Sequence, residues 1–191
     1  PKDYHAPVVY VARHLNMHGP LTFARSFKKD VHIMVLNTFF DKKLAYEHFL
    51  TTTYKNKKNK KFLAKFCSTF IPPMMKSAKF IPVYRGEDSR VFSTIKTAEK
   101  YLEQGQSIAV FPDINYSAKQ DEPSDIYSGF LLLEKSYYKK TGNHLNFVPV
   151  VFDDKNRKII EEEPITFTDD KPFKEELETV KQELVSSINT K

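Results

Sequence analysis

Short, uninterrupted runs of apolar residues recur along the chain, and longer segments with apolar residues at every third or fourth position lie between them. Five such runs are short and rich in β-branched and aromatic residues: 8–12, 31–36, 81–84, 108–111 and 147–152. Runs that are apolar at every position, and not only at alternate ones, are typical of strands buried on both faces of a sheet. The pattern therefore predicts five strands of a largely parallel sheet.

Three segments have the spacing of helices. Segment 91–102 is followed by Gly105, and segment 131–138 stops near Gly142. Segment 170–188 carries a single apolar stripe and predicts a C-terminal amphipathic helix. Strands that alternate with helices indicate an α/β fold, so we expect one domain over 1–191 in which a mixed, largely parallel sheet is flanked by helices.

Composition excludes several classes of protein. Five glycines without a Gly-x-Gly run argue against a dinucleotide or P-loop phosphate cradle, and no Gly-x-Ser-x-Gly turn of a serine hydrolase occurs. Cys67 is the single cysteine, which excludes an intramolecular disulfide and a multi-cysteine zinc site and suits a reducing compartment.

The net charge of +6 is unevenly distributed. Residues 152–191 have 7 basic and 11 acidic side chains, a net of −4, which leaves +10 on residues 1–151. A basic body favours acidic partners such as phospholipid headgroups or coenzyme A phosphates. No apolar run has the length of a membrane span and no signal peptide is visible, although a segment or an anchor before Pro1 stays open.

Four short motifs follow one another, and each places a polar residue at the end of an apolar run. They are Arg-His-Leu-Asn-Met-His-Gly at 13–19, Phe-Ile-Pro-Val-Tyr-Arg-Gly at 80–86, Ala-Val-Phe-Pro-Asp-Ile-Asn-Tyr-Ser at 109–117 and Asn-Phe-Val-Pro-Val at 146–150. Ligands collect at the carboxyl ends of parallel strands, so polar residues in these places are candidates for a functional site.

This order of motifs resembles the glycerolipid acyltransferase family, which includes the 1-acyl-sn-glycerol-3-phosphate acyltransferases. The family has a histidine five residues before an aspartate, then Ile-Pro-Val-x-Arg, Phe-Pro-Glu-Gly-Thr-Arg-Ser and Val-Pro-Val blocks. Ile81-Pro82-Val83 with Arg85 and Gly86 matches the second block, and Phe111-Pro112-Asp113 with Ser117 is similar to the third. The resemblance implies an α/β fold and transfer of a fatty acyl group from a thioester to a hydroxyl.

Acyl transfer of this kind needs a base for the hydroxyl proton and a group that holds the acceptor, but no enzyme nucleophile, because the thioester is already activated. The resemblance, which covers about residues 8–152, implies that His14 is the base; an imidazole with a pKa near 6.5 accepts a proton near neutral pH. Arg85 is then the clamp for an acceptor phosphate, because a guanidinium forks onto a phosphate, and Gly86 permits a tight turn beside it.

The third motif supplies further polar groups. Asp113 keeps the carboxylate of the family's glutamate, one methylene shorter, while Asn115 offers an amide and Ser117 a hydroxyl. A Pro-Asp-x-Asn sequence is also ordinary turn chemistry, so a structural role stays open for these residues.

Two positions depart from the family's pattern. Gly19 stands where the family has its aspartate, and Tyr116 stands where it has its arginine. Either Asp113, which is the best candidate, or another acid from elsewhere orients His14 in place of the missing aspartate, or the site is impaired. Loss of the orienting carboxylate costs about 10⁴ in rate in a Ser-His-Asp triad. Without the arginine, the acceptor is either less anionic or held by Arg85 and lysines alone.

His18 follows His14 by four residues, a spacing that binds zinc on a helix when a glutamate lies between the two histidines. No glutamate intervenes here, and Gly19-Pro20 interrupts the segment. We therefore predict no metal site, and we expect His18 and Gly19 to be neighbours of the pocket.

A basic, aromatic segment precedes the second motif. Its members are Lys55, Lys57, Lys58, Lys60, Lys61, Phe62 and Phe66. Lysines beside aromatic rings suit an anionic membrane surface or another acidic partner; a solvated loop that leads into a core helix is the alternative. No nucleic-acid-binding motif accompanies the lysines, so we expect no nucleic acid as a partner.

We expect a cytoplasmic acyltransferase, peripheral on the membrane, that works in phospholipid synthesis without a bound cofactor. Acyl-CoA or acyl carrier protein is the expected donor, and a lysophospholipid, with 1-acyl-glycerol 3-phosphate favoured, is the expected acceptor. The two departures leave two alternatives open: an acyltransferase with a different, less anionic acceptor, and a non-catalytic module that binds a lipid or an acyl carrier.

Overall fold

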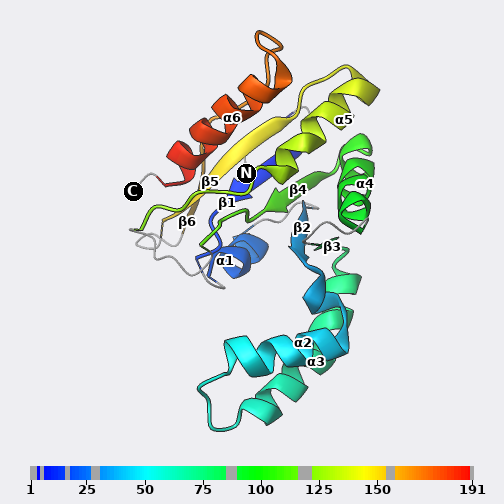
Figure 1. Cartoon of the computed structure of the whole chain (residues 1–191), viewed down its shortest axis with the longest axis vertical. Coiled ribbons are helices and arrows are strands. Elements are labelled where there is room, and N and C mark those ends of the chain that lie inside the picture. The colour runs from blue at the N-terminus through cyan, green and yellow to red at the C-terminus, as the bar shows by residue number, and fades with distance from the viewer. Residues whose placement is uncertain are drawn as a thin grey trace. The chain divides into compact units, whose positions relative to one another are not determined.

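The computed structural model describes residues 4, 7–15, 18–26, 31–84, 90–115, 122–153 and 158–189, with the backbone alone at positions 18, 21 and 158. These residues form two compact units, a larger one from 1–31 and 95–191 and a smaller one from 32–94 (Figure 1). The α/β class and the mostly parallel strand pairing predicted from the sequence are confirmed. The expectation of one domain over 1–191 stays a prediction.

The larger unit contains four strands in the order β4-β1-β5-β6. β1 (Val8–Ala12) pairs in parallel with β4 (Ser107–Val110) on one side and with β5 (Asn146–Asp153) on the other, and β6 (Lys158–Glu161) pairs antiparallel with β5. All five residues of β1 are buried. A strand that is covered on both faces has no position for a solvated side chain, which explains its uninterrupted apolar sequence.

Helices accompany this sheet. α1 (His18–Ser26) contacts β6, and α6 (Phe173–Ile188) packs on β5 and β1. α6 is the predicted amphipathic helix, and it begins three residues after the predicted start at 170. A short 3₁₀ turn, η3 (Gly129–Leu131), leads into α5 (Leu132–Thr141).

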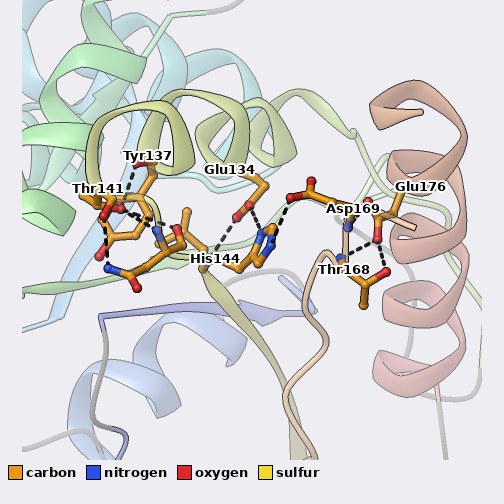
Figure 2. Close-up of polar contacts among 9 residues, drawn as sticks. Glu134, Tyr137, Thr141, His144, Thr168, Asp169 and Glu176 are labelled. Carbon is orange, nitrogen blue, oxygen red and sulfur yellow. Dashed lines mark hydrogen bonds and ion pairs between the residues drawn. The ribbon is translucent and has the colours of Figure 1, made fainter. Parts of the chain in front are cut away.

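A line of polar contacts connects α5 to α6 beside the start of β5 (Figure 2). Glu134 on α5 is 2% exposed; one carboxylate oxygen lies 2.7 Å from Nδ1 of His144, and the other accepts the main-chain N–H of the following residue at 2.8 Å. Nε2 of His144 faces the carboxylate of Asp169 at 3.6 Å. Glu176 on α6 accepts the hydroxyl of Thr168 at 2.7 Å. These contacts hold the loop before β5 and the segment before α6 against the two helices.

In the smaller unit, β2 (Val31–Leu36) pairs in parallel with β3 (Ile81–Val83). Between them the chain forms η1 (Asn37–Phe40), α2 (Lys42–His48), the π-helical turn η2 (Phe49–Thr53) and α3 (Lys60–Ser77). α4 (Arg90–Glu103) belongs in part to each unit.

α2 and α3 pack against each other around a small apolar core (Figure 1). Ala45, Phe49 and Ala64 form its buried centre, and partly buried side chains such as Cys67 pack around it. Asp41 caps α2, because its carboxylate accepts the main-chain N–H groups of Lys43 and Leu44 at 2.8 and 2.9 Å. No helix within the described part of the chain combines the length and the apolar character needed to cross a bilayer.

Candidate functional site

The carboxyl ends of β1 and β4 lie side by side, because these strands are parallel neighbours. His14 follows the end of β1, and Asp113 follows the end of β4. The main-chain N–H of His14 donates a hydrogen bond to Oδ1 of Asp113 at 3.0 Å, although 99 residues separate the two in the sequence. The prediction that the sheet brings these two residues together is confirmed.

Asp113 is held in a buried, charged environment. Its side chain and that of Arg13 are both buried, and Nε of Arg13 lies 3.8 Å from Oδ2 of Asp113. Nη2 of Arg13 also donates to the main-chain carbonyl of Glu122 at 2.6 Å. Burial raises the pKa of Asp113, against the lowering influence of main-chain N–H donors, including that of His14, and of the Arg13 charge.

Arg13 was not among the residues predicted for the site. Its sequence signal is a charged residue directly after five apolar residues of a buried strand, at a place where a solvated side chain is not expected. An arginine that is 4% exposed needs partners for its guanidinium, and Asp113 together with the Glu122 carbonyl supplies them.

The segment that carries Asp113 is tied to a second segment and to α6. Residues 112–114 lie antiparallel to residues 125–127, with a main-chain hydrogen bond of 2.9 Å on each side of the bridge. Ser124, next to this bridge, is fixed by Asn189: the Asn189 amide accepts the Ser124 N–H at 3.1 Å and donates to its carbonyl at 3.0 Å. The position of Asp113 therefore depends on the end of α6.

The turn between β1 and α1 is tight. Leu15 has a φ of 45°, in the left-handed region that a leucine rarely adopts. The N–H of Gly19 donates to the carbonyl of His14 at 3.1 Å. A Cβ at position 19 would lie 2.1 Å from the carbonyl oxygen of Arg13 and 2.8 Å from that of His14. The aspartate of the acyltransferase pattern therefore does not fit here unless the main chain moves.

The imidazole of His14 is partly buried and packs against an aromatic ring. It meets Phe111 edge to face, with ring centroids 6.1 Å apart, and Phe111 meets Phe23 in the same manner at 5.8 Å. These contacts restrict the orientation of the imidazole. The contact described between Asp113 and His14 uses the main chain of His14, so the orientation of the imidazole by Asp113 stays a prediction.

Several predicted site residues fall outside the described part of the chain: Arg85, Gly86, Tyr116, Ser117 and the side chain of His18. Asn115 is exposed, and its N–H donates to the hydroxyl of Ser124 at 3.3 Å. Within the described ranges, no three histidine, cysteine, aspartate or glutamate side chains are grouped so that they can hold a metal ion.

The larger unit is thus an α/β unit with a histidine and a buried carboxylate at neighbouring strand ends. Comparisons with known protein families, with curated proteins and with solved structures give no match to this chain. The resemblance to the glycerolipid acyltransferases rests on the four sequence motifs.

Proposed function

We propose that the protein is an acyltransferase of the glycerolipid type, which moves a fatty acyl group from acyl-CoA or acyl carrier protein to the hydroxyl of a lysophospholipid. The observation that carries the proposal is the meeting of His14 with Asp113 at the ends of two parallel neighbours. These are the first and third motifs of the resemblance, and they meet where α/β proteins bind their ligands.

In the proposed reaction, His14 takes the proton of the acceptor hydroxyl while the hydroxyl oxygen attacks the carbonyl carbon of the thioester. The tetrahedral intermediate then expels the thiolate, which receives the proton from the imidazolium. An acyl ester and a free thiol are formed, and no covalent acyl-enzyme is required. Asp113 supports His14 through the main-chain hydrogen bond, and its carboxylate, when ionised, stabilises the imidazolium.

We assign the binding of the acceptor to the remaining motif residues. Arg85, beside Gly86, binds the phosphate of 1-acyl-glycerol 3-phosphate, while Asn115 and Ser117 supply further polar groups. Because the acceptor is a lipid, we propose that the protein works as a peripheral protein at a membrane surface, in phospholipid synthesis.

Replacement of His14 by alanine tests the chemistry. The variant is expected to lose release of free thiol from acyl-CoA in the presence of lysophosphatidic acid, because no other group takes the hydroxyl proton. Its thermal unfolding midpoint is expected to stay close to that of the parent, since the imidazole is only partly buried. Undiminished thiol release by the alanine variant would refute the assignment.

The residue at position 116 motivates the second candidate, an acyltransferase with a less anionic acceptor. A panel of phosphorylated and neutral acceptors decides between the two, and Tyr116→Arg is expected to shift preference toward the phosphorylated ones because a guanidinium forks onto a phosphate. The absence of thiol release with every acceptor, together with retained binding of acyl-CoA, would favour a non-catalytic module. The closely packed Gly19, which leaves no room for the family's aspartate, is the observation in favour of that module.

A further inference from the structure

α3 carries four large apolar side chains on its exposed side. Phe62, Phe66, Phe70 and Met74 are 71%, 56%, 59% and 54% exposed, and the rings of the second and third lie with centroids 4.8 Å apart. Residues four apart lie above one another on a helix, so the four form one stripe about 18 Å long. We call this set the α3 stripe.

The α3 stripe faces away from the core of the smaller unit. Ala64, Ser68 and Pro72 are the buried residues of α3, and each follows a stripe residue by two positions. Two positions correspond to a rotation of about 200° on a helix. The alternative prediction, a solvated loop that leads into a core helix, agrees with the exposed lysines before α3 and with its buried side. The stripe lies on the opposite side of the helix and leaves a contiguous apolar surface exposed. Surfaces of this kind mark interaction sites.

Lysines surround the stripe. Lys57 and Lys58 precede α3, Lys61 and Lys65 lie next to the first two stripe residues, and all four side chains are exposed. Residues 41–79 contain ten lysines and two acidic residues, a net of +8, whereas the whole chain carries +6. The positive charge of the protein is therefore concentrated in the segment that contains the α3 stripe, and the rest of the chain is slightly acidic.

We propose that the α3 stripe is a docking surface for an anionic bilayer. The helix lies in the plane of the interface, its phenylalanine rings and Met74 enter the boundary between headgroups and acyl chains, and the lysines meet anionic headgroups. Charge favours this occupant over a second copy of the chain, because two copies of a segment with a net charge of +8 repel one another. The inference rests on the proposed association with a membrane, but not on the proposed acyl transfer.

Co-sedimentation with vesicles tests the surface. The probes are vesicles of phosphatidylcholine alone and of phosphatidylcholine mixed with phosphatidylglycerol. The wild-type protein is expected to bind the anionic vesicles, and less at high salt. Replacement of the four stripe residues by serine is expected to lower this binding at least about tenfold, since transfer of even one such side chain from water contributes this much. Phe92→Ser on α4, also an exposed phenylalanine (72%), is the matched control and is expected to bind like wild type.

Charge reversal separates the roles of the two side-chain types. Replacement of Lys57, Lys58, Lys61 and Lys65 by glutamate is expected to abolish the preference for anionic over neutral vesicles. Binding of the stripe variant at the wild-type level would refute the docking surface while membrane association stands. Equal, salt-insensitive binding of the wild type to both vesicle types would refute the anionic partner, and no binding at all would refute both proposals about the membrane.

Two further measurements complete the test. Analytical ultracentrifugation measures self-association. A wild-type dimer that is lost in the stripe variant, together with no vesicle binding, would assign the stripe to self-association and overturn the proposal. Thiol release with a water-soluble, short-chain acceptor is expected to be the same in the wild type and the stripe variant. This assay reports on acyl transfer alone, so its failure is distinguishable from a failure of docking.

Discussion

Position 19 determines how closely the start of α1 approaches the end of β1. With no Cβ, Gly19 brings its N–H to the carbonyl of His14 at 3.1 Å, and the carbonyl of Arg13 occupies the space that a side chain would need. Gly19 therefore does not only lack the carboxylate of the family's aspartate. The main chain around the candidate base packs so closely that position 19 accommodates only a residue without a side chain.

Gly19→Asp restores the residue of the acyltransferase pattern but is expected to lower stability and not to raise activity. The new Cβ meets main-chain oxygen atoms, which cannot rotate away as a side chain does, and overpacking of this type costs roughly 1–3 kcal/mol or more. Thermal unfolding and thiol release measure the two effects. Gly129→Ala is the control, because a Cβ there meets nothing within 4 Å. Unchanged stability with faster thiol release in the aspartate variant would show that the turn adapts and that the aspartate was the missing part.

Asp113 predicts a pH dependence of stability. Its pKa is raised in the folded protein, chiefly by burial, so above about pH 4, where the carboxyl of the unfolded chain is already ionised, the folded state binds more protons than the unfolded state. The contribution of this residue to the free energy of unfolding therefore falls as pH rises from about 4 to the raised pKa. Asparagine does not titrate, and its amide oxygen can still accept the His14 N–H.

The measurement is denaturant unfolding of wild type and Asp113→Asn at several pH values above 4. The stability of the variant relative to the wild type is expected to increase with pH. A difference that stays constant with pH would contradict the raised pKa. A difference that decreases with pH would show that pairing with Arg13 outweighs the burial of the carboxylate.

At the scale of elements, apolar runs predicted five strands to within one or two residues, because strands covered on both faces leave a clear sequence signal. β6 was not predicted, since its Lys-Ile-Ile-Glu sequence is short, is flanked by charge and belongs to a strand paired on one side only. α1 was not predicted because it begins with His18-Gly19-Pro20, and a Gly-Pro sequence is typical of a break in a helix and not of its first turn. Composition identified the aromatic residues of α3, but composition does not tell whether another element covers them.

Glu134 gives a prediction for the contacts that connect α5 to β5. Glu134→Ala leaves the main-chain N–H of Leu145 buried without its acceptor, which is expected to destabilise the protein by about 1–3 kcal/mol. Lys139→Ala on the same helix is the control: its side chain is exposed, and the substitution is expected to have little effect. Denaturant unfolding compares the two variants. Equal losses of stability would mean that burial of the Glu134 carboxylate offsets the benefit of its hydrogen bonds.

At the scale of the whole molecule, the sequence located the candidate chemistry and the candidate membrane contact in segments that belong to different compact units. His14 and Asp113 lie in the larger unit, while the α3 stripe and its lysines lie in the smaller one. The sequence predicted that His14 and Asp113 meet, because strand ends on one edge of a parallel sheet are close. It did not predict Arg13 as the partner of Asp113, because a pairing between side chains depends on burial that the strand pattern alone does not specify.

This separation predicts how salt acts on the proposed activity. Exposed lysines near the α3 stripe act on a membrane through a field that physiological salt screens within about 8 Å, whereas buried charges such as those of Arg13 and Asp113 are screened much less. Rising ionic strength is therefore expected to slow thiol release when the acceptor resides in anionic vesicles and to change the rate little when the acceptor is short-chained and soluble. The variant with glutamate at positions 57, 58, 61 and 65 is expected to show the slow rate on vesicles even at low salt and the normal rate on the soluble acceptor. Equal salt dependence with both acceptors would place the required positive charge at the acceptor site itself and not at the docking surface.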